Sequence, residues 1–386
     1  MLRWLTVCCL AWCSTLWALT PRDVLVVANG TSSASKDLAA AYCAARAVPR
    51  DNMITICVPD VGSVSQAVYR AQIEAPVLAA ARTRQTRAVV LCHGIPWRAL
   101  DEGPDAGNPL STTWASVDAE LATKGRAGTA GLLLSPNPYF RSSTPFVRED
   151  MLLVARLDGA TPRDVLALIA RATNAVPVAA GCAVIDLQPT VNGNSDGMVT
   201  AYNQMLARAA AWLRSQGLTT MVDTNQALIP PPATLVSFYW GWYAGANGDC
   251  TSNTFGDFRW TPGAVGVHVC SFGASGLRLA QQAVPGLVHA GVSATIGTVF
   301  EPLVTGWPQP DVFTHNYVRA DGQGLTFIEA AYSATPFLSW HTVFVGDPLL
   351  RYTPAPPSVD VAPTNIRRTN MPHAAPGVFH RLTSEE

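Results

Sequence analysis

Short apolar runs alternate with helical stretches in the first quarter of the chain. The runs at 23–29, 53–58 and 87–92 are almost continuously apolar, which is typical of strands buried on both faces of a sheet. Helical patterns occupy 33–47 and 66–82 between them. This β-α-β-α-β order predicts a parallel sheet covered by helices, with the three strands as neighbours.

An irregular segment at 97–150 interrupts the alternation, and its Gly, Pro and Ser content is typical of functional or disordered loops. The pattern then resumes. Apolar runs predict further strands at 151–156, 182–187, 220–222, 234–239, 264–270 and 292–299. Helices are predicted at 161–175, 201–216 and 276–290. The Pro-rich, polar segment 353–386 is predicted to be a disordered tail.

The first twenty residues have the pattern of a signal peptide. Arg3 precedes an apolar stretch, 4–19, that is shorter than the roughly 20 residues of a membrane span. An uncleaved anchor is the alternative reading. We therefore predict a secreted or periplasmic protein, with a signal peptide at 1–20 and no membrane span in the mature chain.

The charge content narrows the classes of partner. Charged residues make up 14% of the chain, against about 25% in a typical protein. The 26 basic and 27 acidic residues nearly cancel, which argues against a nucleic-acid partner. No GxGxxG, P-loop, HExxH or CxxC pattern is present, so we predict neither a cofactor nor a metal. Disulfide pairing among the cysteines beyond the signal segment stays open.

Chemically capable residues collect where the predicted strands end. Ligands of open α/β sheets bind beyond the carboxyl ends of the strands. This rule selects His93, Arg156, Asp158, Trp242, Cys270, Ser271 and Glu301. We predict that the site forms where such loops meet.

Cys270 is the candidate nucleophile, with Ser271 beside it. Backbone N–H groups near a strand end can lower a thiol pKa or hold an oxyanion, although a half-buried, inert cysteine is the plainer reading. His93 is a candidate base, and His268 is another because it alternates with Cys270 along one strand face. Asp118 would orient the base.

A carboxylate-based site is a further alternative. Asp118 and Glu120 lie in the irregular segment, and with Asp158 they could bind a cation. Such residues more often cap turns or make loop hydrogen bonds.

The strand-end pieces together resemble an uncharacterised family of secreted bacterial proteins from species that carry the exosortase sorting system. The resemblance covers about 22–352 and includes Arg278, in the piece formed by 271–274 and 277–278. The matching pieces are 93–96, 116–121, 137–140, 156–159, 241–244, 271–274 with 277–278, 300–302 and 346–349. It implies secretion and a shared fold.

The chain also resembles, more distantly, the gingipain-type cysteine peptidases, which are relatives of caspases. That likeness implies two tandem, mostly parallel-sheet α/β subdomains, at 21–178 and 179–352. Cys270 falls at the place of the family's nucleophile. Trp242, 28 residues earlier (270 − 242), stands where the family has the base histidine.

Two functions follow from these observations. The first is a protein that binds a peptide or cell-surface polymer in a strand-end cleft, with weak or no peptidase activity. Arg156, Asp158, Trp242, Arg278 and Glu301 would contact the ligand. The second is an active cysteine or serine hydrolase that uses Cys270 or Ser271.

Overall fold

The computed structural model describes residues 18–100, 114–125, 135–176, 181–188, 197–225, 229–243 and 257–354. Most of the predicted signal segment, the tail from residue 355, Cys250 and the predicted boundary near 178 lie outside these residues. Within them, no helix is long and apolar enough to cross a bilayer.

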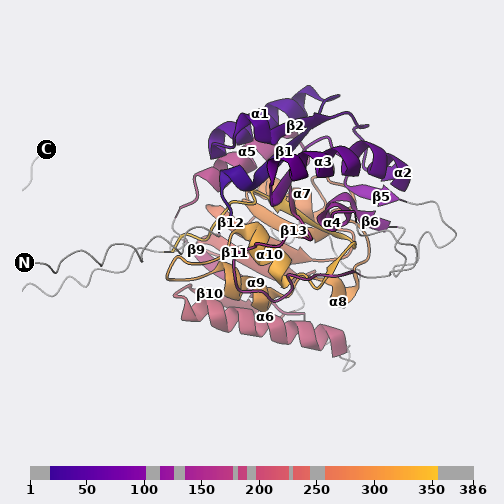
Figure 1. The fold of residues 1–386 in the computed structure, drawn as a ribbon. Helices are drawn as coiled ribbons and strands as arrows, with labels where there is room; N and C mark the ends of the chain where they lie inside the picture. The colour runs from indigo at the N-terminus through magenta and orange to yellow at the C-terminus, as the bar shows by residue number, and fades with distance from the viewer. Residues whose placement is uncertain are drawn as a thin grey trace, which may run out of the picture. The chain divides into compact units, whose positions relative to one another are not determined.

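A ten-stranded sheet forms the centre of the fold (Figure 1). Its strands are β1 (Val24–Asn29), β2 (Met53–Ile56), β4 (Ala88–Cys92), β8 (Leu153–Leu157), β9 (Gly181–Asp186), β10 (Thr220–Asp223), β11 (Leu235–Trp242), β12 (Trp260–Val269), β13 (Ala294–Thr298) and β15 (Thr342–Gly346). Their order across the sheet is β10-β9-β11-β12-β13-β15-β8-β4-β1-β2. One sheet therefore contains strands from both predicted subdomains.

The predicted neighbours β4, β1 and β2 are confirmed. Val24 pairs with Ala88 and Val26 with Met53, both in parallel register. β12 and β13 are also parallel, whereas β15 is antiparallel to β13. Two smaller sheets consist of β3 (Ser63–Ser65), β5 (Arg98–Leu100) and β6 (Trp114–Ser116), and of β7 (Ser135–Pro136) and β14 (Phe337–Leu338).

Helices cover both faces of the large sheet (Figure 1). The helices are α1 (Ser33–Arg46), α2 (Gln66–Val68), α3 (Ala75–Arg84), α4 (Val117–Ala122), α5 (Pro162–Thr173), α6 (Gly197–Ser215), α7 (Ala283–Ala290), α8 (Leu303–Gly306), α9 (Pro310–Tyr317) and α10 (Phe327–Ala334). A π-helical segment, Tyr69–Glu74, joins α2 to α3. α5 packs between α1 and α7, and α9 packs between α6 and α10.

Side chains alternate along the central strands between these two helical layers. On β11, Phe238 and Trp240 pack on Phe313 of α9. Tyr239, between them, lies in a cluster with Leu287 of α7. The period of two thus assigns successive residues to opposite faces.

Two predicted elements differ from the structure. Residues 117–122 form the helix α4 rather than a loop, because Ser116 caps it by accepting a hydrogen bond from Ala119 and all six residues are buried. The predicted helix 276–290 begins only at Ala283. The residues before it form turns, in which the Gln282 side chain accepts a hydrogen bond from the backbone N–H of Gly276.

Candidate functional site

A fully buried arginine, Arg156, lies at the centre of a charged network where β8 ends. Its Nε and Nη2 donate to Asp118 of α4, the latter at 2.6 Å from Oδ2. Its Nη1 donates to Asp158 at 3.0 Å and to the carbonyl of Ile95, and Nη2 also reaches the carbonyl of Pro96. A buried charge is tolerated only with such partners, so the network fixes the loops after β4 and β8 against α4.

The second oxygen of Asp158 joins the network to His93 and Arg278. His93 Nδ1 lies 3.0 Å from Oδ1, and Arg278 forms an ion pair with the same oxygen. Burial alone would raise the pKa of Asp158, but Arg278, the His93 hydrogen bond and Arg156 outweigh it and hold that pKa well below its usual range. Asp158 is therefore an ionised anchor for three nitrogen-bearing side chains.

The carboxyls on α4 shift in the opposite direction. Burial raises the pKa of Asp118 more than the charge of Arg156 lowers it. Burial likewise raises the pKa of Glu120, although the Ser339 hydroxyl donates to that carboxyl. Asp118 and Asp158 share one guanidinium, yet their pKa values are displaced in opposite directions.

Arg278 comes from the turns after β12 and connects them to the other loops. Its guanidinium lies over the Trp97 ring, 5.2 Å from the centroid, and Trp97 Nε1 donates to the carbonyl of Ser275. Arg278 Nη2 is buried and has no hydrogen-bond partner among the described residues. The loops after β4, β8 and β12 therefore meet around a guanidinium with unused donor capacity.

A second polar pair lies beside these loops. Ser271 Oγ donates to Glu301 Oε2 at 2.5 Å, and the other oxygen of Glu301 accepts from the backbone N–H of Leu303. Phe272 and Leu303 have φ values of 63° and 56°, which is uncommon for residues other than glycine. Strained backbone of this kind clusters at binding and catalytic sites.

Cys270 lies on the α7 face of the sheet. Its side chain is only 2% exposed and packs in a cluster that contains Cys182, Tyr239 and Leu287. His268 shares this face, as the alternation predicts, and its Nδ1 lies 2.9 Å from the Tyr239 hydroxyl. The thiol is thus enclosed by apolar and aromatic groups.

Trp242 points to the opposite face, towards α6. Its ring packs edge-on against Tyr202 at 5.2 Å, and its Nε1 donates to Asn203. It is therefore part of the α6 packing, and the enclosure of Cys270 comes from the cluster on the α7 face.

The structure thus brings together His93, Asp118, Arg156, Asp158 and Arg278, and separately pairs Ser271 with Glu301. Sequence reasoning missed Trp97, although it follows the strand-end motif at 93–96 and the strand-end rule could have selected it. It also missed Asp186, at the end of β9. Burial, followed by the nearby charge of Asp223, raises the pKa of Asp186 to about 8.

Within the described part of the chain, no group of three or more His, Cys, Asp or Glu side chains is placed to hold a metal ion. The carboxylates proposed for a cation, Asp118 and Asp158, are instead bound to Arg156. Glu120 accepts from Ser339.

Comparison with known proteins connects the fold to peptidases. No protein-family model matches the chain, and no curated protein resembles it in sequence. Among solved structures, the Arg-specific cysteine proteinase gingipain R aligns with a TM-score of 0.50 at 12% identity, over 87% of this chain and 79% of that one. The complex of the pro- and mature domains of Porphyromonas gingivalis RgpB aligns with a TM-score of 0.46 at 13% identity, over 86% and 80%. The mixed α/β architecture, with its large and mostly parallel sheet, is thus similar to that of gingipain-type cysteine proteinases.

Proposed function

We propose that this chain is a peptide-binding protein built on a peptidase-like scaffold, with little or no peptidase activity of its own. The burial of Cys270 carries the proposal. A nucleophilic cysteine must be accessible to its substrate, whereas the Cys270 side chain is 2% exposed and packs in a cluster with apolar side chains.

The binding surface is the meeting point of the loops after β4, β8 and β12. Phe272 and Leu279 are 41% and 46% exposed, an unusual exposure for large apolar side chains on adjacent turns. Arg278 lies between them in the sequence, and its side chain is 27% exposed, so its guanidinium borders the same surface and can attract a carboxylate of the ligand. Apolar groups with a few fixed donors are the usual composition of a ligand site.

Site-resolved alkylation of the folded protein tests the first part of the proposal. Iodoacetamide labelling from about pH 5 to pH 9, read by peptide mass spectrometry, compares Cys270 with the exposed Cys57 as an internal reference. We expect Cys57 to label as an ordinary thiol and Cys270 to stay protected. Labelling of Cys270 below about pH 7 at or above the rate of Cys57 would establish a reactive thiol and contradict the proposal.

Fluorescence polarisation with labelled, reduced casein tests the second part. We expect the wild type to bind without cleaving, and Arg278→Gln to bind several-fold more weakly. Arg163→Gln on α5 is the control, because it removes the same charge from an exposed position outside these loops. Equal binding by Arg278→Gln, or fragments that vanish in Cys270→Ala, would overturn the assignment.

The second candidate is a serine hydrolase, favoured by the pair of Ser271 and Glu301. A carboxylate that accepts the hydroxyl hydrogen bond is positioned to take its proton as the oxygen attacks a carbonyl carbon. Casein cleavage that persists in Cys270→Ala but is lost in Ser271→Ala would select this alternative.

Export of the protein is also proposed, on the basis of the apolar segment that follows Arg3. N-terminal sequencing of protein from its native host should start at about residue 18 to 23. An intact Met1 in a soluble cytoplasmic fraction would refute export.

A further inference from the structure

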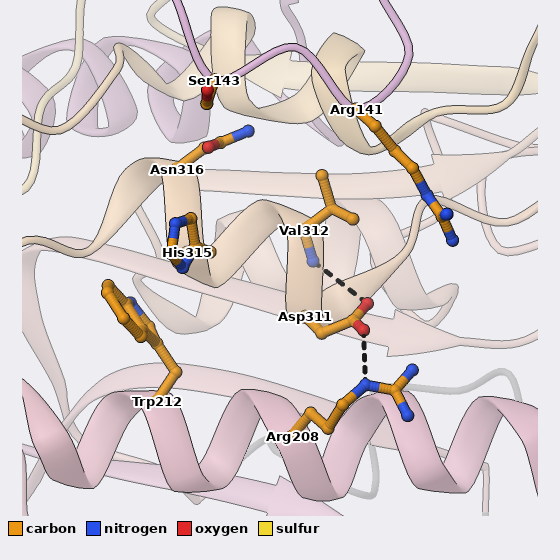
Figure 2. Close-up of a pocket in the computed structure, with 8 residues that line it drawn as sticks. All are labelled: Arg141, Ser143, Arg208, Trp212, Asp311, Val312, His315 and Asn316. Atoms are coloured by element: carbon orange, nitrogen blue, oxygen red, sulfur yellow. Dashed lines mark hydrogen bonds and ion pairs between the residues drawn. The ribbon is translucent and has the colours of Figure 1, made fainter.

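Two pockets lie along one face of α6, on the side of the sheet opposite Cys270. The cationic pocket, about 400 Å³, is lined by residues that include Arg141, Arg208, Trp212, Asp311, Val312 and His315 (Figure 2). The apolar pocket, about 260 Å³, is lined by residues that include Ala201, Tyr202, Met205, Val304, Trp307 and Gln309. Ala201, Met205, Arg208 and Trp212 recur at the spacing of a single helix face, so the two pockets follow one another along it.

Arg208 supplies one charged wall of the cationic pocket. Its Nε donates to Asp311 Oδ2 at 2.8 Å, while the other oxygen of Asp311 accepts from the backbone N–H of Val312 (Figure 2). The Arg208 side chain is 57% exposed and, within the described residues, makes this contact through Nε alone. Its two terminal nitrogens remain available to a second acceptor.

Arg141 supplies the other charged wall and is held in place from several sides. Its φ of 59° turns the loop over α9, and its backbone N–H donates to the carbonyl of Ser333 at 2.7 Å. Asn316 of α9 donates to the carbonyl of Ser142 and fixes the next residue. Nε and Nη2 of Arg141 donate to Gln309, so its guanidinium is preorganised beside the pocket.

The other walls combine apolar and hydrogen-bonded groups with the exposed Ser143. The Trp212 ring packs against His315 at 4.2 Å, and its Nε1 is used by the carbonyl of Val318. Asn316 Nδ2 is engaged with Ser142 and Ser333. Ser143 and the His315 ring can serve other polar groups of a ligand, but the two guanidiniums beside the Trp212 ring best fit a carboxylate attached to an apolar body.

Gln309 and Tyr202 connect the pockets to each other and to the sheet. Gln309 lines the apolar pocket and accepts the hydrogen bonds from Arg141 of the cationic pocket. Tyr202 lines the apolar pocket and packs on Trp242, where β11 ends. The two pockets, which we call the α6 groove, therefore follow α6 towards the two arginines, and Tyr202 links the apolar pocket to the packing around the end of β11.

We propose that this α6 groove binds an extended peptide that places an apolar side chain between Met205 and Trp307 and a carboxylate between Arg141 and Arg208. The helix face from Ala201 to Trp212 is about 16 Å long at 1.5 Å per residue. An extended peptide of about five residues covers that length at about 3.3 Å per residue. The groove is a different surface from the strand-end loops and does not depend on the function proposed for them.

Fluorescence polarisation with the pentapeptide Gly-Leu-Phe-Gly-Glu, labelled with fluorescein at its amino end, tests the proposal. Four forms combine Glu or Gln with a free or amidated carboxyl end, and so separate a side-chain carboxylate from a terminal one. We expect the doubly neutral form to bind at least about tenfold more weakly than the form with both carboxylates, since a charge-assisted hydrogen bond is lost. Equal binding of all four forms would refute the carboxylate site.

Matched variants of the full chain locate the binding. Arg208→Gln and Met205→Ser should each weaken binding of the Glu peptide by about tenfold, while Arg163→Gln leaves its affinity unchanged. If Arg278→Gln loses peptide binding while Arg208→Gln binds as well as the wild type, the peptide binds at the strand-end loops and this inference is overturned. Competition by oligouronate with no peptide binding would also overturn it, in favour of an acidic polysaccharide. Thermal unfolding of each variant confirms that the fold is retained.

Discussion

The two halves of the large sheet have the same strand order but different side chains at the ends of equivalent strands. Numbered along the chain within each half, the order 2-1-3-4 describes both β2-β1-β4-β8 and β10-β9-β11-β12. The third strand is followed by His93 in the first half and ends with Trp242 in the second. The fourth is followed by Asp158 in one half and Cys270 in the other.

The partners at these equivalent ends account for the difference. Asp158 is buried but ionised because three cationic or imidazole groups surround it. Cys270 instead packs in a cluster with Leu287 and the Tyr239 ring. A shared backbone arrangement therefore does not determine the chemistry, which is decided by the side chains that adjoining helices and loops supply.

The largest expected effect on stability comes from removing Arg156, the central residue of the charged network. Arg156→Met leaves Asp118 and Asp158 buried without their shared cation and should cost about 3–5 kcal/mol of unfolding free energy. Urea unfolding measures it. Arg163→Met, exposed on α5, should change stability by no more than about 0.5 kcal/mol. A small effect of Arg156→Met would show that the two halves differ less than their contacts indicate.

Asp158→Asn should cost about 2 kcal/mol at neutral pH, because a hydrogen-bonded charge is lost. The pKa of Asp158 is lowered in the folded state, so its contribution is present above the unfolded value of about 3.9 and fades as the pH falls below it. The difference between wild type and variant should therefore shrink below about pH 4. A difference that stays constant with pH would mean that the ionised carboxylate is not responsible.

Asp186, at the end of the first strand of the second half, should show the opposite pH dependence. Its pKa is raised to about 8, so the folded state binds more protons and wild-type stability falls as the pH rises from about 4 to about 8. Asp186→Asn should be more stable than wild type by about 1–3 kcal/mol near pH 9 and nearly equal to it near pH 4. Thermal unfolding at the two pH values checks this, and equal stability at pH 9 would contradict it.

The smallest expected effect on stability comes from substitutions in the strained turn after β12. Phe272→Gly removes the cost of φ 63°, whereas Phe272→Ala retains it, and both remove the ring packed on Phe300 at 5.0 Å. The glycine variant should be the more stable of the two by about 1 kcal/mol. The reverse order in urea unfolding would show that the left-handed conformation is not strained.

Many regular elements were predictable because they depend on local patterns, but the sequence analysis predicted none of α8, α9, α10, β14 or β15. The run 87–92 and the Thr161–Pro162 helix start encode their own strand and cap, and both are confirmed. α4 was not predictable, since its six residues are held by a cap and by burial against distant parts of the chain.

The candidate site was predictable only in part. The strand-end rule selected His93, Arg156 and Asp158, which do meet. The convergence of Cys270 with them remains a prediction. The sequence alone does not determine to which face of the sheet a strand-end side chain points, because that depends on register and packing.

The strand β15 has a consequence for the order in which the chain can fold. It lies between β13 and β8, and Val345 is opposite Arg156, 189 residues earlier (345 − 156). Until residues 342–346 are synthesised, β8 and β13 are open edges that can pair with other chains. Contacts of such long sequence separation form slowly. The seam of the sheet is thus closed by the strand of that sheet that leaves the ribosome last, and a chain shortened before it would be prone to aggregate rather than merely less stable.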